Sequence, residues 1–527
     1  MHRFKGRTIA WAITLVLIAL GLRWHWLTAS LRDQASGILP DDAFYYFEIA
    51  RRFAAGQGIT FDGTTPATGL HLGWLFLISP LFVHADPGSA WPVRLTLTLS
   101  SLLAAFAALA AGRLSWRISG SFALGLLTSL VVSTSAWFIH QTINGLETAL
   151  VSSVILVCLL HLFSQIEQPS RMGAVRLAAW TLLALFCRSD SLVFLAPAYS
   201  LLLLRRDRLR ENATIVAVVG LGVLGLSLWN FLHTGSWLQS SANAIPAVFK
   251  QNWLRFHPDE SLRQHSLGQF LVICRDTWHA LGITSILVAA GCTICLFGAV
   301  ILGLQKPRRQ ALFPLCGLWI LLGVGLFALH FVHGYVRWLP RPWYCVSAVY
   351  VLALAPAFAY RAVSSLISES QVPAWGGRLF AVSLSVWPIH EFHLSCVEYS
   401  VPAYVWQAEM YDAGVAIDHD LPPGLVGSFN AGIIGYMATR PVINLDGVVN
   451  EAAARARRED HFYDYLRTRG VAYLVDSPAM WDDPLFLDGA RPQWGHPFTE
   501  PRLIHAYDVS GVGWPHAADS VEAVELR

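Results

Sequence analysis

Residues 40–51 read Pro-Asp-Asp-Ala-Phe-Tyr-Tyr-Phe-Glu-Ile-Ala-Arg and directly follow the first long apolar segment of the chain. Two adjacent carboxylates, Asp41 and Asp42, therefore stand where the chain is expected to leave a membrane. Charged groups close to hydrocarbon are costly and are usually kept for a function. An aromatic run follows the pair, so this segment predicts a polar site at the edge of a membrane-embedded protein.

The composition of the 527-residue chain is typical of an integral membrane protein. Hydrophobic residues make up 54% and charged residues 14% of the sequence, whereas soluble proteins carry about 25% charged residues. The mean hydropathy is +0.47. A formal net charge of +2 without a basic, aromatic-interleaved patch excludes nucleic acid as an expected partner, and membrane lipids are expected instead.

Neither the cysteines nor the N-terminus indicates a secreted, disulfide-linked protein. Eight cysteines are present, and most of them lie inside apolar segments. Cys292 and Cys295 have a CxxC spacing but no second pair, so packing is their expected role. Arg3, Lys5 and Arg7 precede an apolar run that has no small-residue cleavage site, which predicts an uncleaved first helix.

About eleven apolar segments approach the length needed to cross a bilayer. Lysine and arginine mark cytoplasmic loops, and the basic clusters fall on one side only if residues 175–204 form a hairpin of two short helices. A single helix there would place Arg188 and Asp190 near the bilayer centre, at about 2.5–3.5 kcal/mol for each charge. The expected topology has the N-terminus inside and the C-terminus outside. The segments are 8–28, 91–112, 119–138, 146–165, 175–187, 191–204, 213–233, 281–304, 311–333, 344–360 and 379–395.

A shorter apolar run at residues 72–83 cannot span a membrane at about 1.5 Å per residue and is expected to be interfacial or half-inserted. The expected topology gathers the unusual polar residues on the outer face. This face holds the loop 29–90, the turn 139–146, the Arg188-Ser189-Asp190 turn, the loop 234–280 and the turn 334–343.

After residue 396 the long apolar runs end, and turn signals become frequent. Short apolar runs that alternate with a charged, helical stretch at 451–469 predict a small α/β domain. The expected organisation is a polytopic helical membrane domain, residues 1–395, followed by an extracytoplasmic α/β domain, residues 396–527. The strand-like runs are 425–429, 442–446 and 472–476.

Several segments resemble the GT-C glycosyltransferases. Pro40-Asp41-Asp42 with Tyr45-Tyr46 resembles the first outer loop of this superfamily, which includes protein O-mannosyltransferases, aminoarabinose transferases of lipid A and mycobacterial arabinosyltransferases. The tail resembles the outer domain of uncharacterised bacterial members. The further segments that carry the likeness are 56–63, 68–71, 144–150, 188–190, 426–432 and 442–447.

The resemblance implies an enzyme of a bacterial inner membrane that takes a sugar from a polyprenyl-phosphate carrier and passes it to an extracytoplasmic acceptor. The phosphate is already a competent leaving group. One base for the acceptor hydroxyl and cations for the phosphate are therefore enough, and inversion at the anomeric carbon is expected. Nothing in the sequence indicates a metal ion or another cofactor.

Asp41 matches the position of the catalytic base in the family, and Asp42 is expected to orient it or to contact the acceptor. The structural alternative is that Asp41 only starts a helix, because aspartate caps helix N-termini well. Phe44 stands where a capping box would need glutamate, which weakens this alternative. Tyr45 is expected to pack, and the role of Glu48 is open.

Two candidate substrate-binding residues each have a structural alternative. Glu147 either completes a capping box with Asn144 or supplies the acidic group that the family likeness implies on the second outer loop. Arg188 either neutralises Asp190 in the hairpin turn or reaches the phosphate, which guanidinium binds in a bidentate way.

Arg341 and Tyr344 belong to a short basic and aromatic turn that suits phosphate and sugar binding, although interfacial aromatic belts look similar. Lys250 and His71 are weaker phosphate candidates, and Leu72 stands where relatives often carry proline. Histidines without metal-like spacing, expected at the interface, are His279, His330 and His333.

Two other classes of function fit the sequence less well. A transporter or lipid flippase binds near the midplane, often between repeated halves, whereas this chain shows no repeat and gathers its polar residues on one face. A non-catalytic scaffold of the same fold is disfavoured by the intact Asp41-Asp42 pair.

Overall fold

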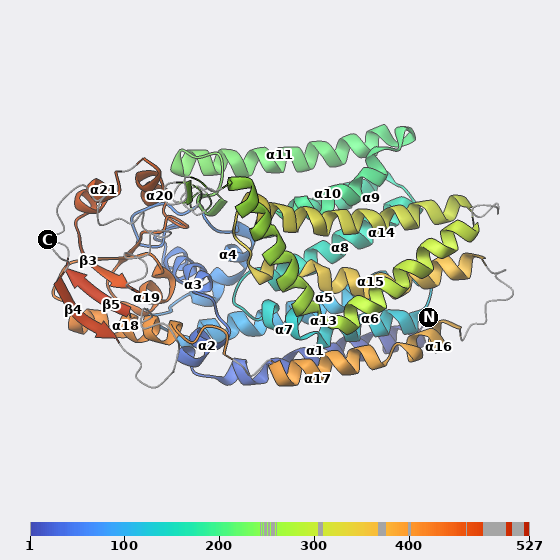
Figure 1. The fold of residues 1–527 in the computed structure, drawn as a ribbon, viewed down its shortest axis with the longest axis horizontal. Coiled ribbons are helices and arrows are strands. Elements are labelled where there is room, and N and C mark those ends of the chain that lie inside the picture. Colours follow the sequence, from blue (N-terminus) through green and yellow to red (C-terminus); the bar gives the residue numbers. More distant parts are fainter. Residues whose placement is uncertain are drawn as a thin grey trace.

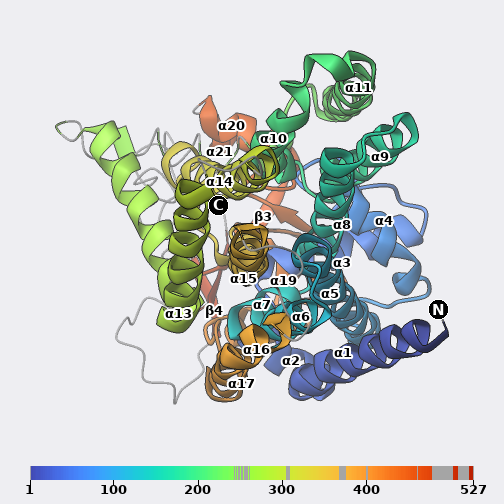
Figure 2. The same cartoon turned by 90° about the vertical axis from the view of Figure 1, so that its right-hand side faces the viewer.

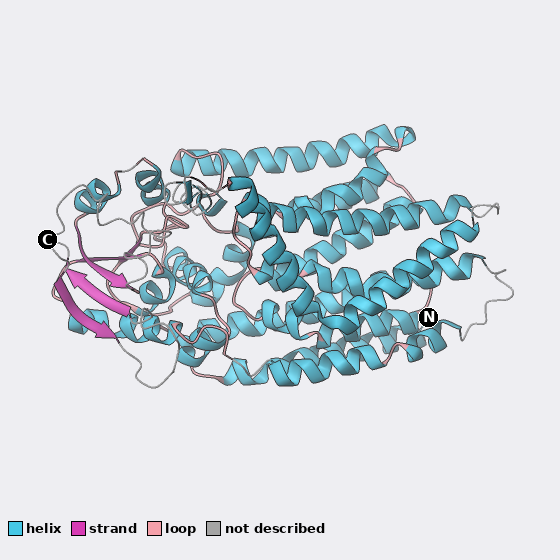
Figure 3. Cartoon of the chain, viewed as in Figure 1, coloured by secondary structure: helices cyan, strands magenta, loops and turns pink. Residues whose placement is uncertain are grey.

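The structure is a computed structural model of the chain. It describes residues 2–242, 261–303, 309–366, 376–398, 402–459, 461–477, 502–507 and 521–525, with isolated positions between 243 and 260. Figure 1 shows an elongated molecule in which a bundle of helices makes up one end. The strands are confined to the opposite end, as the colours of Figure 3 make plain.

The bundle follows the apolar segments of the sequence, and each of the eleven predicted segments coincides with helical residues. Within the described part of the chain, seven helices are long and apolar enough to cross a membrane. The bent pair α6 and α7, with an angle of 61°, makes an eighth when it is counted as one span. The chain is an integral membrane protein, and the count of about eleven is met only when the shorter helices are included. The helices are α1 (His2–Thr28), α5 (Ala90–Ser119), α6 (Phe122–Thr134), α7 (Ala136–Thr142), α8 (Thr148–Glu167), α9 (Arg171–Cys187), α10 (Ser191–Leu203), α11 (Leu209–Thr234), α13 (Leu262–Gly303), α14 (Arg309–His330), α15 (Ser347–Leu366), α16 (Gly376–Ser383) and α17 (Val386–Glu398).

The predicted hairpin between residues 175 and 204 is confirmed. α9 ends at Cys187 and α10 begins at Ser191, so Arg188 and Asp190 lie in the turn between them. α11 packs mainly on α9, and Figure 2, which looks along the bundle, shows it at the periphery. The short run after residue 71 forms α4 (Leu72–Ile78) and a 3₁₀ turn, η1 (Ser79–Phe82), packed against α9.

The chain after α17 contains a five-stranded sheet with the order β2-β1-β3-β5-β4. β1, β2 and β3 are parallel, whereas β5 runs antiparallel to both β3 and β4. The three predicted strands are confirmed. β4 and β5 were not predicted, because polar residues interrupt their apolar pattern. The strands are β1 (Leu425–Ser428), β2 (Val442–Asn444), β3 (Val471–Asp476), β4 (Arg502–Tyr507) and β5 (Val521–Glu525).

The sequence predicted one helical stretch at 451–469. This prediction is wrong in one respect, because the segment forms two helices, α20 (Glu451–Arg458) and α21 (Phe462–Arg469). The backbone N–H of His461 donates to the carbonyl of Ala456 at 2.9 Å. This bond closes the turn as in a Schellman motif, which ends α20 and redirects the chain.

One hydrophobic core joins the segment between α1 and α5, which the sequence predicted to be the first outer loop and which keeps that name here, to the C-terminal part. It combines residues of α2 (Leu31–Gly37), α3 (Asp41–Ala54) and α4 with residues of α18 (Gln407–Asp420), α19 (Ala431–Met437) and the sheet. Phe44 and Phe47 of α3 lie 5.8 and 6.0 Å from the Tyr436 ring of α19, between ring centroids. A smaller core on the other face of the sheet includes Phe462 and Leu466 of α21. The C-terminal part is therefore folded onto the first outer loop and shares its main core with it.

Gly69 marks a close approach within this junction. A Cβ atom at Gly69 would lie 1.6 Å from the carbonyl oxygen of Val448. We expect Gly69→Ala to lower the thermal unfolding temperature of the detergent-solubilised protein, because overpacking costs about 1–3 kcal/mol. The matched control is Gly220→Ala in α11, where nothing lies within 4 Å. There alanine should be neutral or stabilising, by about 0.5–1 kcal/mol, and an equal loss in both variants would contradict the tight junction.

Candidate active site

A cavity lies where the helical bundle, the first outer loop and the C-terminal part meet. Its walls come from α3, the segment before α4, the start of α8, the turns that follow α14, and the loop after β2. The polar and aromatic lining residues are Asp42, Tyr45, Tyr46, His71, Glu147, Ser241, Arg337, Arg341, Trp343 and Tyr344.

The structure brings most of the predicted site residues to this cavity. Asp42, His71, Glu147, Arg341 and Tyr344 line it. Arg188 lies beside it, with its guanidinium carbon 4.6 Å from the centre of the Tyr344 ring. Asp41 and Lys250 are not among the lining residues. The Lys250 ammonium donates to the Val336 carbonyl oxygen and faces the Trp338 ring at 5.6 Å.

Asp41 is turned away from the cavity and toward the C-terminal part. α3 begins at Asp41 and has no side-chain cap of its own, so the aspartate does not cap its own helix. Its carboxylate instead accepts hydrogen bonds from the backbone N–H groups of Gly432, at 3.1 Å, and Ile433, at 2.7 Å, at the start of α19. Burial raises the pKa of Asp41 to about 8, although these two hydrogen bonds oppose the rise.

Asp42 faces the cavity, because successive residues of a helix are about 100° apart around its axis. Its carboxylate accepts no hydrogen bond from any residue that the structure describes. Burial raises the pKa of Asp42, the Arg341 guanidinium opposes this rise, and the Glu147 carboxylate adds to it. Asp42 therefore lines the cavity whereas Asp41 does not, and the catalytic roles expected for the two carboxylates stay predictions.

The predicted capping box at Glu147 does not form. The side-chain oxygen of Asn144 accepts from the backbone N–H of Leu146, and Glu147 makes no side-chain cap at the start of α8. One Glu147 oxygen lies 3.7 Å from the Nε2 of His71 and 3.7 Å from the Nε of Arg188. The other oxygen, Oε2, is buried and has no hydrogen-bond partner in the described part of the chain. Glu147 thus belongs to the site rather than to a helix cap.

His71 contributes a neutral ring to the same wall. Burial lowers the pKa of His71, while the nearby Glu147 carboxylate opposes this change. The backbone N–H of His71 donates to the Tyr46 hydroxyl at 2.9 Å, which fixes the segment before α4 against α3. The neutral imidazole can exchange hydrogen bonds with a ligand, but it adds little positive charge for a phosphate.

Arg188 and Asp190 form an ion pair in the hairpin turn, with a distance of 2.9 Å between Nε and Oδ1. Arg188 also donates to the carbonyl of Trp343 at 3.1 Å. Burial would raise the pKa of Asp190, but Arg188 and a hydrogen bond from His333 hold it well below its usual range. These contacts support the alternative in which Arg188 neutralises Asp190 in the hairpin turn, because the charge of Arg188 is compensated there.

His333 and His330 are not interfacial, contrary to the expectation from the sequence. His333 is fully buried, bonded to Asp190 at 2.6 Å, and stacked on Tyr344 with 3.8 Å between ring centroids. His330 is also buried and lies 2.9 Å from the Thr277 hydroxyl. His333 belongs to η3 (Phe331–Val336), a π-helical turn that follows His330 at the end of α14. Such turns are frequent at functional sites, but no sequence signal marked this one.

Two arginines provide positive charge at the cavity. Arg337, which extends from the turn after η3, donates to the carbonyl of Ser241 at 2.9 Å, and its buried Nε has no partner among the described residues. Arg341 precedes η4 (Pro342–Tyr344), and its guanidinium carbon lies 5.8 Å from the centre of the Trp343 ring. In the part of the chain that the structure describes, no three His, Cys, Asp or Glu side chains are grouped to hold a metal ion.

Comparisons with known proteins agree with the resemblance seen in the sequence. Residues 401–517 match a family described as a domain of unknown function, DUF8728. No curated protein matches the sequence significantly. Among solved structures, ArnT from Cupriavidus metallidurans bound to undecaprenyl phosphate superimposes with a TM-score of 0.55 and 14% identity, over 98% of each chain.

A second similar structure is the archaeal oligosaccharyltransferase AglB from Archaeoglobus fulgidus, in complex with an inhibitory peptide and a dolichol phosphate. Its TM-score is 0.50 at 14% identity, over 90% of this chain and 70% of that chain. At this identity the likeness concerns the fold, and it shows that this chain has a GT-C-like fold.

Arg188 should be important for stability because two buried carboxylates depend on its charge. We expect Arg188→Gln to destabilise the protein by about 3–5 kcal/mol, the usual cost of breaking a buried ion pair. The double variant with Asp190→Asn should recover part of the loss, as measured by thermal unfolding in detergent. Wild-type stability of Arg188→Gln would show that the ion pair does not support the hairpin.

Proposed function

We propose that this chain is an inverting glycosyltransferase that moves a sugar from a polyprenyl-phosphate carrier to a hydroxyl group of an extracytoplasmic acceptor. One observation carries the proposal. Asp42, whose carboxylate accepts no hydrogen bond from the described residues, lines the same cavity as Arg337, whose Nε has no partner among them, and the exposed Arg341. Such a cavity combines a base for the acceptor with cations for a phosphate.

The reaction needs only one displacement. Asp42 takes the proton of the acceptor hydroxyl, and the oxygen of that hydroxyl attacks the anomeric carbon of the sugar. The bond between that carbon and the phosphate oxygen breaks, and the electron pair leaves with the phosphate. Arg337 and Arg341 stabilise the charge that develops there, because guanidinium groups bind phosphate oxygens in a bidentate way. The products are the glycosylated acceptor, the polyprenyl phosphate and protonated Asp42, with inversion at the anomeric carbon.

The remaining lining residues suit the sugar itself. Trp343 offers an aromatic face on which a sugar ring can pack, whereas the Tyr344 ring is already stacked on His333 and covered by Arg188. The unpartnered Oε2 of Glu147 can accept a hydrogen bond from a sugar hydroxyl, which would remove the cost of leaving it buried and unpaired. Asp41 has a structural role in this scheme, as an anchor for α3.

The proposal also sets the orientation in the membrane. The N-terminus lies in the cytoplasm of a bacterium, and the cavity and the sheet lie outside the inner membrane. The carrier reaches the cavity from the lipid phase. The ArnT and AglB structures, determined with undecaprenyl phosphate and dolichol phosphate, support a donor of this class.

Carrier binding can be tested directly with undecaprenyl phosphate. We expect this lipid to raise the thermal unfolding temperature of the purified protein, and the double variant Arg337→Gln/Arg341→Gln to lose most of the rise. Arg361→Gln is the matched control, because Arg361 is an exposed cation near the far end of α15.

Mass spectrometry of envelope glycans with and without the gene then identifies the acceptor. Unchanged glycans together with no lipid binding would favour a scaffold or a transporter.

The two aspartates should differ in their effect on catalysis. We expect Asp42→Asn to lower kcat by about 10²- to 10⁴-fold, the usual contribution of a general base. Asp41→Asn should cost less, because an amide oxygen still accepts one backbone hydrogen bond at α19. Steady-state transfer rates of both variants measure this difference. A larger loss of kcat in Asp41→Asn than in Asp42→Asn would assign the role of the base to Asp41.

The pH dependence should report the surroundings of Asp42. The base must be deprotonated, so kcat/KM rises with pH, and burial places this rise above the ordinary aspartate value of about 3.9. Arg341 lowers the pKa of Asp42, so Arg341→Gln should move the rise to higher pH, while Arg361→Gln leaves it in place. A move to lower pH in Arg341→Gln would contradict the assignment.

A further inference from the structure

The parallel strands of the C-terminal sheet end in polar residues. Ser428, Asn444 and Asp476 are the last residues of β1, β2 and β3. β1 has β2 on one side and β3 on the other, so the strand order switches direction at β1. In open α/β sheets, ligands bind in the crevice outside the carboxyl ends of the strands at such a switch point.

In this protein, helix α3 of the same chain fills that crevice. The Tyr45 hydroxyl accepts hydrogen bonds from the Nδ2 of Asn444 at 3.0 Å and from the backbone N–H of Ala431 at 3.2 Å. It donates to the carbonyl oxygen of Phe429 at 3.2 Å. The Asp41 carboxylate occupies the start of α19, the position where α/β folds often hold an anion.

The start of α19 and the turn before it have a shape that admits α3. A Cβ atom at Gly432 would lie 2.2 Å from the Asp41 carbonyl oxygen, so only glycine permits the approach. The buried Asp476 carboxylate accepts from the Ser428 hydroxyl at 2.9 Å and from the backbone N–H of Phe429 at 2.8 Å. These bonds hold the turn between β1 and α19 in the shape that receives α3.

The two anchors determine where Asp42 points. Asp41 and Tyr45 are four residues apart, so they share one face of α3. That face is bonded to the strand ends and to α19, and this contact fixes the rotation of the first helical turn. Asp42 is rotated by about 100° from Asp41 and is thereby directed to the cavity.

We propose that the C-terminal part, which matches a family without a described function, serves as a receptor for α3, and that Tyr45 and Asn444 are positioning residues for Asp42. The inference rests on the proposed function only in its claim that Asp42 reacts with a substrate. The anchoring of α3 is measurable without any substrate.

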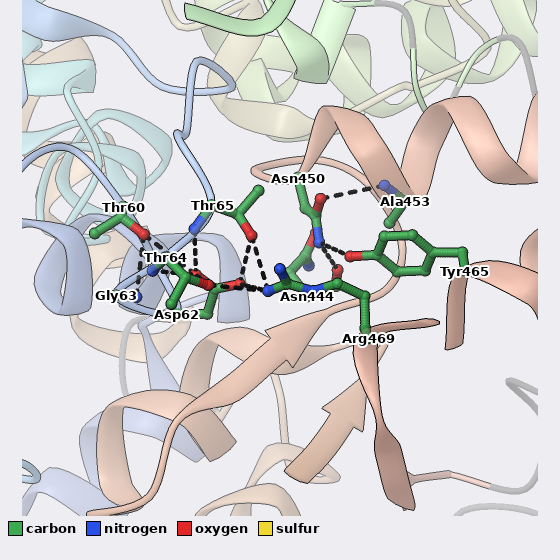
Figure 4. A network of polar contacts seen from close by, with 10 residues as sticks. All are labelled: Thr60, Asp62, Gly63, Thr64, Thr65, Asn444, Asn450, Ala453, Tyr465 and Arg469. Atoms are coloured by element: carbon green, nitrogen blue, oxygen red, sulfur yellow. Dashed lines mark hydrogen bonds and ion pairs between the residues drawn. The ribbon is translucent and has the colours of Figure 1, made fainter. Parts of the chain in front are cut away.

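A second contact between the same two parts provides the matched control. Figure 4 shows Arg469 of α21 reaching the loop after α3, where its Nη2 lies 3.2 Å from Asp62, 2.9 Å from the Thr64 hydroxyl and 3.2 Å from the Thr65 hydroxyl. This clamp joins the first outer loop to the C-terminal part, but among the described residues it makes no hydrogen bond to Asp41, Asp42 or Tyr45. Arg469→Gln therefore loosens the junction without touching the anchors of α3.

The test is to measure the accessibility and titration of Asp42 in the full detergent-solubilised chain. A water-soluble carbodiimide with glycine ethyl ester modifies protonated carboxyl groups, and tandem mass spectrometry resolves Asp42 from Asp41 over a pH series. The titratable groups that interact with Asp42 are Arg341, Glu147, Asp41, Asp446, Tyr45, Tyr344 and Tyr404. A rotation of α3 changes the distances from Asp42 to Arg341 and Glu147 on the other elements, so we expect Tyr45→Phe and Asn444→Ala to shift the pH midpoint of Asp42 modification.

The control Arg469→Gln should leave this midpoint unchanged while it lowers the unfolding temperature. An unchanged midpoint in both anchor variants, or an equal shift in Arg469→Gln, overturns the inference. If Tyr45→Phe fails to fold, Asn444→Ala alone provides the comparison, because the tyrosine hydroxyl retains Phe429 and Ala431 as partners.

Activity provides a separate readout. With a sugar-loaded polyprenyl phosphate as donor, we expect Tyr45→Phe to lower kcat by about 10- to 100-fold, as misplacement of a catalytic group does, with KM for the donor unchanged. A loss that appears only in KM overturns the positioning role. If the midpoint shifts but the wild type neither binds undecaprenyl phosphate nor transfers sugar, the proposed function fails and the anchoring of α3 stands.

Discussion

The Asp41 carboxylate lies in a junction from which most water is excluded, and an isolated charge or unpaired polar group there would be costly. Two backbone N–H groups at the start of α19 make the position tolerable. The Tyr45 hydroxyl fills the adjoining crevice, and the apolar residues of α3 complete a core that both parts of the chain share. Once this contact forms, the direction of α3 is set, and with it the wall of the cavity that carries Asp42. The site therefore depends on a contact that does not itself touch the ligand.

The charges around the cavity fall into two groups with different consequences. Arg188 and His333 both bond the Asp190 carboxylate, and this network supports the turn between α9 and α10, although the Nη2 of Arg188 and the Nδ1 of His333 have no partner among the described residues. Within the described residues, the buried Oε2 of Glu147 and the buried Nε of Arg337 have no partner, and the half-buried Asp42 and the exposed Arg341 face the same cavity without side-chain hydrogen bonds. Groups of the first kind stabilise the fold, whereas groups of the second kind are suited to a ligand that completes their hydrogen bonds.

The sequence predicted the features that depend on local pattern. Apolar length and the distribution of arginines predicted the helices and the break at residues 188–190, and short apolar runs predicted β1 to β3. The aspartate pair was recognised as part of a site, but the contact that turns Asp41 away from the cavity was not foreseen, because its donors Gly432 and Ile433 lie 391 and 392 positions away. The burial of His333 depends on a π-helical turn without a known sequence signal, and Glu147 fits a capping box equally well until the structure shows its surroundings.

The shared core has a consequence for biosynthesis. The first outer loop is made early, but the residues that cover its apolar surface and bond Asp41 follow roughly 390 positions later. At about 5–20 residues per second, translation leaves that surface uncovered for about 20–80 s. During this interval the loop can pack on the bundle, as α4 does on α9, but the face of α3 that meets α19 stays uncovered, so its final folding must wait for the arrival of α19 and the sheet. A nascent or truncated chain would insert its early helices into the bilayer without assembling the cavity, so the ability to process a lipid carrier would appear only when synthesis is nearly complete.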